Sequence, residues 1–174
     1  RKYLMLDKYI QSDQPVADKE VYKGQADVLK TRLRAMEQEI KEKKLPVIIL
    51  FEGWGASGKG YVISKTINCL DPRSYKVYST VKATESEKRM PLMYRFWDNI
   101  PEKGKLCIYD RSWYQEIVPA ALEEDISEED VIERMNMTNV FERQLTDDGY
   151  LIVKIFLQID RGEQKRRFKK LLDS

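Results

Sequence analysis

Short apolar runs rich in β-branched residues recur along the chain, separated by longer segments with helical periodicity. Residues 47–51 form a continuous apolar run, which is typical of a strand buried on both faces, as in a parallel sheet. Residues 105–109 and 150–159 are further apolar strands, and the alternating residues 75–80 predict another. Helices are predicted at residues 60–70, 86–99, 112–122, 127–145 and 161–172. This alternation indicates an α/β fold, a doubly wound and mostly parallel sheet flanked by helices.

A long polar helix is predicted before the first strand, over residues 18–44. Leu29, Leu33, Met36 and Ile40 are spaced four, three and four residues apart, so they form one apolar stripe along it. The stripe either packs on the sheet or contacts a helix of a partner.

The chain is expected to hold one domain, residues 18–174, after a lead-in of residues 1–17. It begins at Arg1 instead of Met and stops at Ser174 without a Gly or Pro stop signal. Both ends are therefore expected to be cuts in a longer protein. The domain is expected to be truncated at its C-terminus, with a fifth strand beyond Ser174.

A glycine-dense turn joins the first strand to the helix that follows. Gly53, four intervening residues and Gly58-Lys59 match the spacing of a P-loop. Glycines let successive backbone N–H groups face a phosphate, and the helix N-terminus adds partial positive charge. The expected phosphate-binding residues are Gly53, Gly55, Ala56, Ser57, Gly58, Lys59 and Gly60. The alternative is a plain tight turn. The P-loop signature ends in Ser or Thr, whereas this chain has Gly60, so a metal must be held by other residues.

Asp110 closes the apolar strand at residues 105–109, which is the pattern of a Walker-B element. A carboxylate at this strand end faces the glycine-rich turn and can hold Mg²⁺ directly or through water. The planar fork of Arg111 is suited to clamping a phosphate. The alternative is a turn with surface ion pairs.

Two further segments carry candidate ligand contacts. The polar loop at residues 82–85 follows a strand at its expected carboxyl end, where open α/β sheets bind ligands. Thr84, Glu85 and Arg95 are therefore candidates for the nucleotide or acceptor site. The helix at residues 161–172 is strongly basic and includes Arg167. Either it forms a solvated face, or at least one of its basic residues contacts phosphate.

Charge and composition narrow the function. The 174 residues carry a net charge of +2, so a polyanion site must be a local cluster, and nucleic-acid binding is not expected. The absence of histidine excludes histidine triads and histidine metal sites. Cys69 and Cys107 lie in apolar contexts and are expected to be reduced core residues of a cytoplasmic protein. No apolar run is long enough to predict a membrane span.

Several motifs occur in order and together resemble the family-2 polyphosphate kinases. They are Glu-Gly-Trp-Gly-Ala-Ser-Gly-Lys-Gly at 52–60, Asp-Pro-Arg at 71–73, Tyr-Arg-Phe-Trp at 94–97, Asp-Arg-Ser-Trp-Tyr at 110–114, Phe-Glu-Arg-Gln at 141–144, and Glu163-Gln164 with Arg167-Phe168. The resemblance implies a P-loop kinase fold with a helical lid, and Mg²⁺-dependent phosphoryl transfer between polyphosphate and a nucleotide, AMP or ADP. By position, Lys59 would hold the transferred group, Asp110 the Mg²⁺ and Arg111 the phosphates. Arg167 would be a phosphate-binding arginine of the lid. Some members carry two such domains in tandem, so a tandem domain or a second copy is the expected partner.

This chain departs from the family pattern at two points within the site. Active members usually have Asp where this chain has Gly55, and Glu116 stands where a basic residue is usual. One alternative is therefore a degenerate domain that binds polyphosphate without turnover, in which Gly55→Asp is expected to raise activity. Another alternative is a different P-loop kinase that uses ATP as donor.

Overall fold

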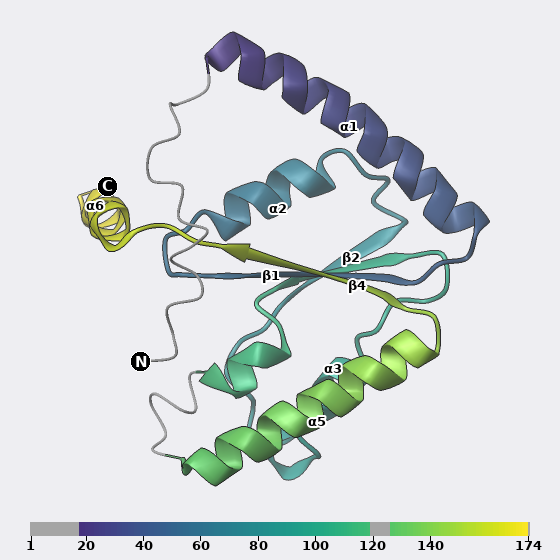
Figure 1. Ribbon diagram of the computed structural model, residues 1–174, viewed down its shortest axis with the longest axis vertical. Helices are drawn as coiled ribbons and strands as arrows, with labels where there is room; N and C mark the ends of the chain where they lie inside the picture. The colour runs from purple at the N-terminus through teal and green to yellow at the C-terminus, as the bar shows by residue number, and fades with distance from the viewer. Residues whose placement is uncertain (1–17, 119–125, 174) are drawn as a thin grey trace.

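The computed structural model describes residues 18–118 and 126–173, and its fold is a parallel sheet between two layers of helices (Figure 1). The four strands have the order β2-β3-β1-β4 and pair in parallel throughout. They are β1 (Val47–Gly53), β2 (Tyr75–Ser79), β3 (Leu106–Asp110) and β4 (Leu151–Leu157). The predicted doubly wound α/β sheet is confirmed.

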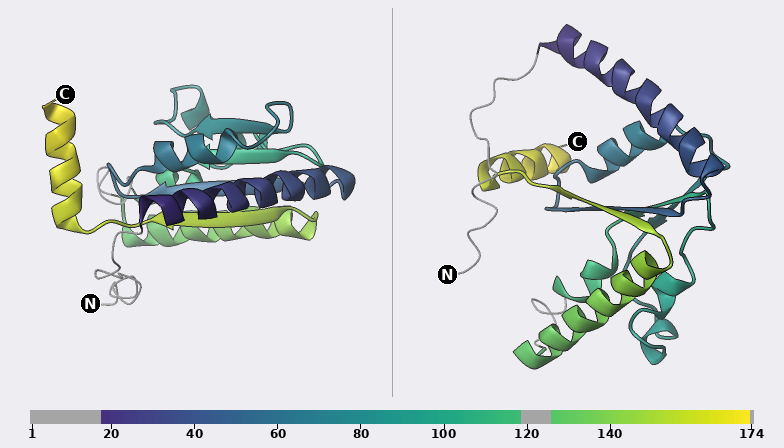
Figure 2. Two further views of the ribbon diagram at one scale, coloured as in Figure 1. Left: turned by 90° about the horizontal axis from the view of Figure 1, so that it is seen from above. Right: turned by 45° about the vertical axis from the view of Figure 1, so that its right-hand side comes forward.

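Helices cover both faces of the sheet. α1 (Lys19–Glu42) and α2 (Lys59–Ile67) lie on one face, and α3 (Tyr94–Trp97) and α5 (Glu128–Asp147) lie on the other (Figure 1). α6 (Arg161–Leu172) lies beyond the end of β4 and runs across the direction of the other helices (Figure 2). The predicted helices at residues 18–44, 60–70, 127–145 and 161–172 are confirmed. Ser127 caps α5 in a reciprocal capping box with Asp130.

The strand register brings the functional ends of the strands to one edge. Asp110 pairs with Phe51 on β1 and with Ser79 on β2. From β1 the chain crosses to β2 on one side, and from β3 it crosses to β4 on the other side. Ligands of open α/β sheets bind where the strand order reverses in this way. The topology therefore places a site beyond the carboxyl ends of β1 and β3.

Apolar side chains of β1 and β3 fill both faces of the sheet. Ile48 and Leu50 join the α5 side, where Trp113 is fully buried, while Phe51 and Ile108 join the α2 side. Fully burying one such aliphatic or aromatic side chain contributes about 1.5–3 kcal/mol. The central strands are thus held firmly, which fixes the positions of the loops at their ends.

One predicted helix is wrong in extent, and another is only partly described. Residues 86–99 form a 3₁₀ turn η2 (Glu87–Arg89) and the short α3, because Pro91 lies between them and cannot continue a helix. Within this segment Met93 and Phe96 are buried, while Met90 and Trp97 are exposed. Residues 112–122 begin with a 3₁₀ turn η3 (Trp113–Glu116), and residues 119–125 lie outside the described part.

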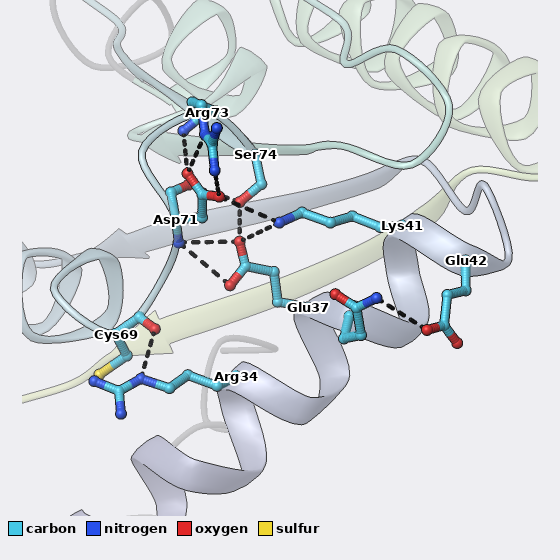
Figure 3. Close-up of polar contacts among 9 residues, drawn as sticks. Arg34, Glu37, Lys41, Glu42, Cys69, Asp71, Arg73 and Ser74 are labelled. Carbon is cyan, nitrogen blue, oxygen red and sulfur yellow. Dashed lines mark hydrogen bonds and ion pairs between the residues drawn. The ribbon is translucent and has the colours of Figure 1, made fainter.

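The predicted apolar stripe of α1 is wrong at two positions. Leu29 and Met36 are more than half exposed, at 59% and 55%, whereas Leu33 and Ile40 are partly buried. The buried face is centred on Glu37, whose carboxylate accepts hydrogen bonds from the Ser74 hydroxyl and the Asp71 N–H (Figure 3). A polar anchor, rather than a continuous apolar stripe, therefore docks this helix on the turn before β2.

β4 is an edge strand and not the core strand that its apolar sequence predicts. Leu151, Val153 and Phe156 are exposed on it. Its outer edge pairs with no other strand among residues 18–118 and 126–173. The lead-in at residues 1–17 lies outside the described residues, and the domain limits and the fifth strand stay predictions.

Two other expectations concern the whole chain. Cys69 and Cys107 are both buried and free, as predicted. No helix in the described part is long and apolar enough to cross a membrane.

Candidate active site

The glycine-rich loop after β1 has the backbone of an anion cradle. Ala56 and Gly58 both have positive φ, at 59° and 96°, on either side of Ser57. Alternating right- and left-handed residues turn successive N–H groups toward one concave side. Gly53 is required where the loop leaves the sheet, because a Cβ there would lie 2.2 Å from the Leu157 carbonyl oxygen. The loop leads directly into the N-terminus of α2 at Lys59.

Lys59 folds back onto this loop. Its Nζ donates to the carbonyl oxygens of Gly53 and Trp54, at 2.8 Å and 3.1 Å. Burial lowers the pKa of its ammonium, and the charge of Arg111 lowers it further, whereas Asp110 and Glu52 raise it. Lys59 therefore lies within electrostatic reach of all three charges at the ends of β1 and β3. These bonds to two loop carbonyls hold its ammonium beside the cradle.

Asp110 and Arg111 lie at the predicted Walker-B position, at the carboxyl end of β3. Oδ1 of Asp110 is buried without a hydrogen-bond partner in the described residues, as is the Ser57 hydroxyl. Arg111 has φ of 62° and donates its N–H to the Phe51 carbonyl at 3.0 Å. Positive φ in a non-glycine residue is costly and concentrates at functional sites. The Arg111 side chain is exposed and lines a cavity.

Asp110 has a carboxylate oxygen at this strand end that no hydrogen bond occupies among the described residues. Glu52 is already engaged, because its Oε1 accepts from the Ser112 N–H and hydroxyl, both at 2.7 Å. No cluster of three or more His, Cys, Asp or Glu side chains suited to a metal occurs within the described ranges. An ion here would take most of its ligands from water and substrate, as Mg²⁺ commonly does at phosphate sites.

α6 closes over the outer side of the glycine-rich loop. Gln164 Nε2 donates to the Gly55 carbonyl at 3.0 Å. The Arg167 guanidinium donates to the carbonyls of Ala56 and Ser57, at 3.2 Å and 3.1 Å, and to the Glu163 carboxylate. Arg167, the predicted lid residue, therefore contacts the loop by hydrogen bonds to its carbonyl oxygens.

A cavity of about 780 Å³ lies beside Arg111, between the end of β2 and the start of α5. Its lining carries five basic and two acidic side chains: Lys82, Lys88, Arg95, Arg111, Arg134, Glu87 and Glu116. Arg95 lies between the two acids, 3.5 Å from Glu87 and 3.4 Å from Glu116. The cavity therefore offers an excess of positive charge to an anion, with carboxylates that orient the central arginine.

The other two predicted acceptor residues do not line this cavity. The Thr84 N–H and hydroxyl are bonded to Glu87, and the exposed Glu85 pairs with Lys88. Arg95 alone of the three reaches the cavity.

A partly buried network behind the site joins the Asp-Arg-Ser-Trp-Tyr and Phe-Glu-Arg-Gln motifs. Glu142 accepts from the Trp113 indole at 2.9 Å, from the Tyr114 hydroxyl at 2.8 Å and from Lys154 at 2.6 Å. Trp113 also packs edge-on against Phe141, with centroids 5.0 Å apart. α5 thereby fixes the segment that follows Asp110.

Sequence reasoning missed Arg134 and Glu87 in the cavity and the role of Glu142. Arg134 lies within α5 and donates to the Glu116 carbonyl, a contact between distant segments that no local pattern announces. The sequence does point to Glu142, because it belongs to the Phe-Glu-Arg-Gln motif at 141–144, but the motif alone does not indicate its role.

Residues 16–174 match the protein family described as Polyphosphate kinase 2 (PPK2). The chain is 34% identical over 152 residues to Polyphosphate:AMP phosphotransferase of Pseudomonas aeruginosa PAO1, covering 87% of this chain and 31% of that protein. It is 35% identical over 147 residues to NDP-polyphosphate phosphotransferase 3 of Ruegeria pomeroyi, covering 84% of this chain and 49% of that protein. The chain thus spans half or less of these relatives.

Solved structures agree in fold. A crystal structure from Pseudomonas aeruginosa PA01, assigned to polyphosphate kinase 2, matches with a TM-score of 0.92 and 31% identity, over 100% of this chain and 38% of that one. Polyphosphate Kinase 2 from Arthrobacter aurescens TC1 matches with a TM-score of 0.86 over 91% of this chain and 58% of that one, at 24% identity that supports the fold alone. The family match over nearly the whole chain, together with the glycine-rich loop and the Asp110 strand end, shows that this chain belongs to the polyphosphate kinase 2 family.

Proposed function

We propose that this domain transfers a phosphoryl group between inorganic polyphosphate and a nucleotide, AMP or ADP, with Mg²⁺. The observation that carries the proposal is that Arg111 lines the basic cavity and that its charge also reaches Lys59, at the end of the glycine-rich loop. The charge of Asp110 acts on Lys59 as well, so the loop and the cavity adjoin each other at the end of β3. Two phosphate-bearing substrates can thus approach one point from two directions. The names of the relatives describe the same class of reaction.

The cavity is suited to the nucleotide. Its volume of about 780 Å³ is within the ~300–1,000 Å³ of ordinary small-molecule sites. Arg95 and Arg111 supply planar forks for phosphate oxygens, and Arg134 adds a third guanidinium to the wall. We assign the nucleotide phosphate to this group and the polyphosphate end to the loop.

The chain contributes charge and alignment to the reaction. Phosphoryl transfer depends on neutralising and orienting phosphates more than on covalent catalysis, so the lack of histidine does not oppose it. Lys59 would exchange its bonds to Gly53 and Trp54 for phosphate oxygens, and Arg111 would hold the group between the two substrates. A Mg²⁺ ion on Asp110 would bridge phosphate oxygens and neutralise their charge.

A binding domain without turnover is the second candidate, and Gly55 motivates it. The loop lacks a carboxylate at this position, and Phe168 lies against it. This candidate predicts polyphosphate binding with no product. A kinase that uses ATP as donor would instead bind ATP and ignore polyphosphate.

The wider setting is part of the proposal. Because the chain covers only 31% and 49% of the two relatives, the partner is proposed to be a tandem domain or a second copy. The chain is proposed to work in the cytoplasm, where AMP is available and thiols such as Cys69 and Cys107 stay reduced.

The test is ADP formation by the full-length protein from AMP, long-chain polyphosphate and Mg²⁺. Lys59→Ala and Asp110→Asn are expected to lower the rate at least about 100-fold, as loss of a charge-stabilising group typically does. Lys65→Ala is the matched control on α2, where the lysine lies over the Tyr61 ring. Product that persists in both site variants would place the chemistry in another domain. Polyphosphate binding without any product would support the second candidate.

A further inference from the structure

One face of α6 grips three consecutive carbonyls of the glycine-rich loop. Gln164 and Arg167 are three residues apart on the helix. Gln164 donates a hydrogen bond to the Gly55 carbonyl, and Arg167 donates to the carbonyls of Ala56 and Ser57. The two partners come from segments 109 to 111 residues apart in the chain. The loop is therefore held by the lid through its backbone, and the loop side chains are not needed for this contact.

The direction of these bonds decides which side of the loop faces a phosphate. Carbonyls that α6 holds cannot turn into the concave side, and the positive φ of Ala56 and Gly58 supports that arrangement. One loop N–H, that of Ser57, already donates to the Trp54 carbonyl at 3.1 Å. A loop without this restraint could turn carbonyl oxygens toward the phosphate, which would repel it. Binding energy would then be lost in reordering the loop.

Two of the three guanidinium nitrogens of Arg167 donate hydrogen bonds to protein groups. Its Nε donates to Glu163, and its NH1 donates to the loop carbonyls. Glu163 also pairs with Arg166, and both arginine hydrogen bonds lower the pKa of its carboxyl to about 2, so it stays charged at neutral pH. Glu163 therefore keeps Arg167 aimed at the loop.

We propose that Gln164 and Arg167 are positioning residues that clamp the glycine-rich loop by its carbonyls, so that its N–H groups are set for an oligophosphate before it binds. The proposal rests on the proposed function in one respect, that this loop binds phosphate. It differs from the role expected for Arg167 from the sequence, which is direct contact with phosphate. Gln164 separates the two ideas, because its amide carries no charge and its donor is spent on Gly55.

The test is binding of tripolyphosphate to the full-length protein by titration calorimetry, at several salt concentrations and without nucleotide. Gln164→Ala and Arg167→Ala are each expected to weaken binding roughly fivefold to tenfold, in line with loss of one positioning hydrogen bond. The slope of log Kd against log salt should stay at the wild-type value, because no phosphate contact is removed. Arg167→Gln should recover part of the affinity, since its amide can still donate to a carbonyl.

Amide hydrogen exchange supplies a second readout. With tripolyphosphate bound, residues 54–58 should be less protected in Gln164→Ala than in wild type. Lys165→Ala, one residue along the same helix, should leave the exchange of the loop unchanged.

The outcomes separate the clamp from the proposed function. A slope that falls by about one unit in Arg167→Ala, with wild-type affinity in Gln164→Ala, would make Arg167 a phosphate ligand and overturn the clamp. Clamp effects in a protein that forms no ADP would uphold the clamp and reject the transferase. A wild-type protein that does not bind tripolyphosphate would overturn both.

Discussion

The ring of Phe168 occupies the space that a Cβ atom on Gly55 would need. An ideal Cβ there would lie 2.9 Å from the ring Cζ, closer than real Cβ atoms approach. Gly55 is not among the residues with positive φ, so its backbone would accept a side chain. Phe168 is therefore the main obstacle to a side chain at this position, with Gln164 Nε2 at an ordinary contact distance of 3.8 Å, and residues 55 and 168 are coupled across the loop and α6.

The Gly55–Phe168 contact modifies the expected effect of restoring a carboxylate. Gly55→Asp alone should displace the ring and loosen α6, so we expect lower stability and no gain in ADP formation. Gly55→Asp with Phe168→Ala should fit the carboxylate and exceed the activity of Phe168→Ala alone. The double-mutant cycle, measured by urea unfolding, should give a coupling energy of about 1 kcal/mol. Equal effects of Gly55→Asp in both backgrounds would show that the ring is not the obstacle.

Arg95 is expected to decide nucleotide affinity. Arg95→Ala removes a guanidinium from the cavity and leaves Glu87 and Glu116 facing it without their shared cation. The KM for AMP should rise at least about tenfold, equivalent to roughly 1.4 kcal/mol, while the KM for polyphosphate changes little. Steady-state kinetics with each substrate varied in turn measures both constants. Arg89→Ala is the matched control, because Arg89 is exposed and does not line the cavity. A larger effect on polyphosphate would reassign the cavity to that substrate.

Glu142 is expected to stabilise the fold through the buried indole of Trp113. Glu142→Ala leaves the Trp113 N–H without its acceptor in a fully buried setting, which costs about 1–3 kcal/mol. Glu142→Gln keeps an acceptor and should lose less. Urea denaturation followed by circular dichroism compares the two, with the exposed neighbour Arg143→Ala as control. If the Gln and Ala variants unfold at the same urea concentration, the hydrogen bond is not the source of the stability.

Glu37 is expected to hold α1 on the sheet. Glu37→Ala leaves the Asp71 N–H and the Ser74 hydroxyl without this acceptor, and Lys41 loses an ion pair (Figure 3). The expected loss is about 1–3 kcal/mol in the free energy of unfolding, with faster amide exchange along α1. Glu39→Ala is the control on the same helix, because Glu39 is exposed and pairs only with Lys43 in the described contacts. Equal losses from the two changes would argue against a special role for Glu37.

Cys107 is expected to resist alkylation in the folded protein. Burial raises the pKa of its thiol to about 12, so the reactive thiolate is scarce at pH 8, and the side chain is only 1% exposed. Iodoacetamide at pH 8 should leave Cys107 unmodified in mass spectra of the native protein and modify it fully in urea. The rate should increase as pH approaches 12, because the thiolate fraction grows there. Rapid modification at pH 8 without unfolding would mean that β3 opens.

Local sequence patterns were sufficient for the elements that carry the candidate site. The apolar run of β1, the glycine spacing after it and the aspartate that ends β3 are each contained in a few adjacent residues. The alternation of strands and helices predicts a parallel sheet. Parallel strands run in the same direction, so the carboxyl ends of β1 and β3 lie at the same edge. Lys59, Asp110 and Arg111 could therefore be singled out and placed on one edge of the sheet.

Patterns failed where a distant contact or a single breaker outweighed periodicity. The residues at 86–99 have helical spacing, yet Pro91 divides them. Leu29 and Met36 extend an apolar stripe, yet α1 turns Glu37 to the sheet because that carboxylate finds two donors on the turn before β2. The apolar residues of β4 predict burial, yet the strand lies at an edge.

The sequence by itself determined the parallel α/β sheet, the glycine-rich loop and the carboxylate beside it, since these depend on neighbours along the chain. Only the tertiary structure decided that Arg95 and Arg134 share a cavity, and that Gln164, Arg167 and Phe168 meet the loop. The contacts between α6 and the loop join residues more than 100 positions apart in the sequence. Their formation depends on how β4 leaves the sheet and where α6 comes to lie, which local periodicity does not encode.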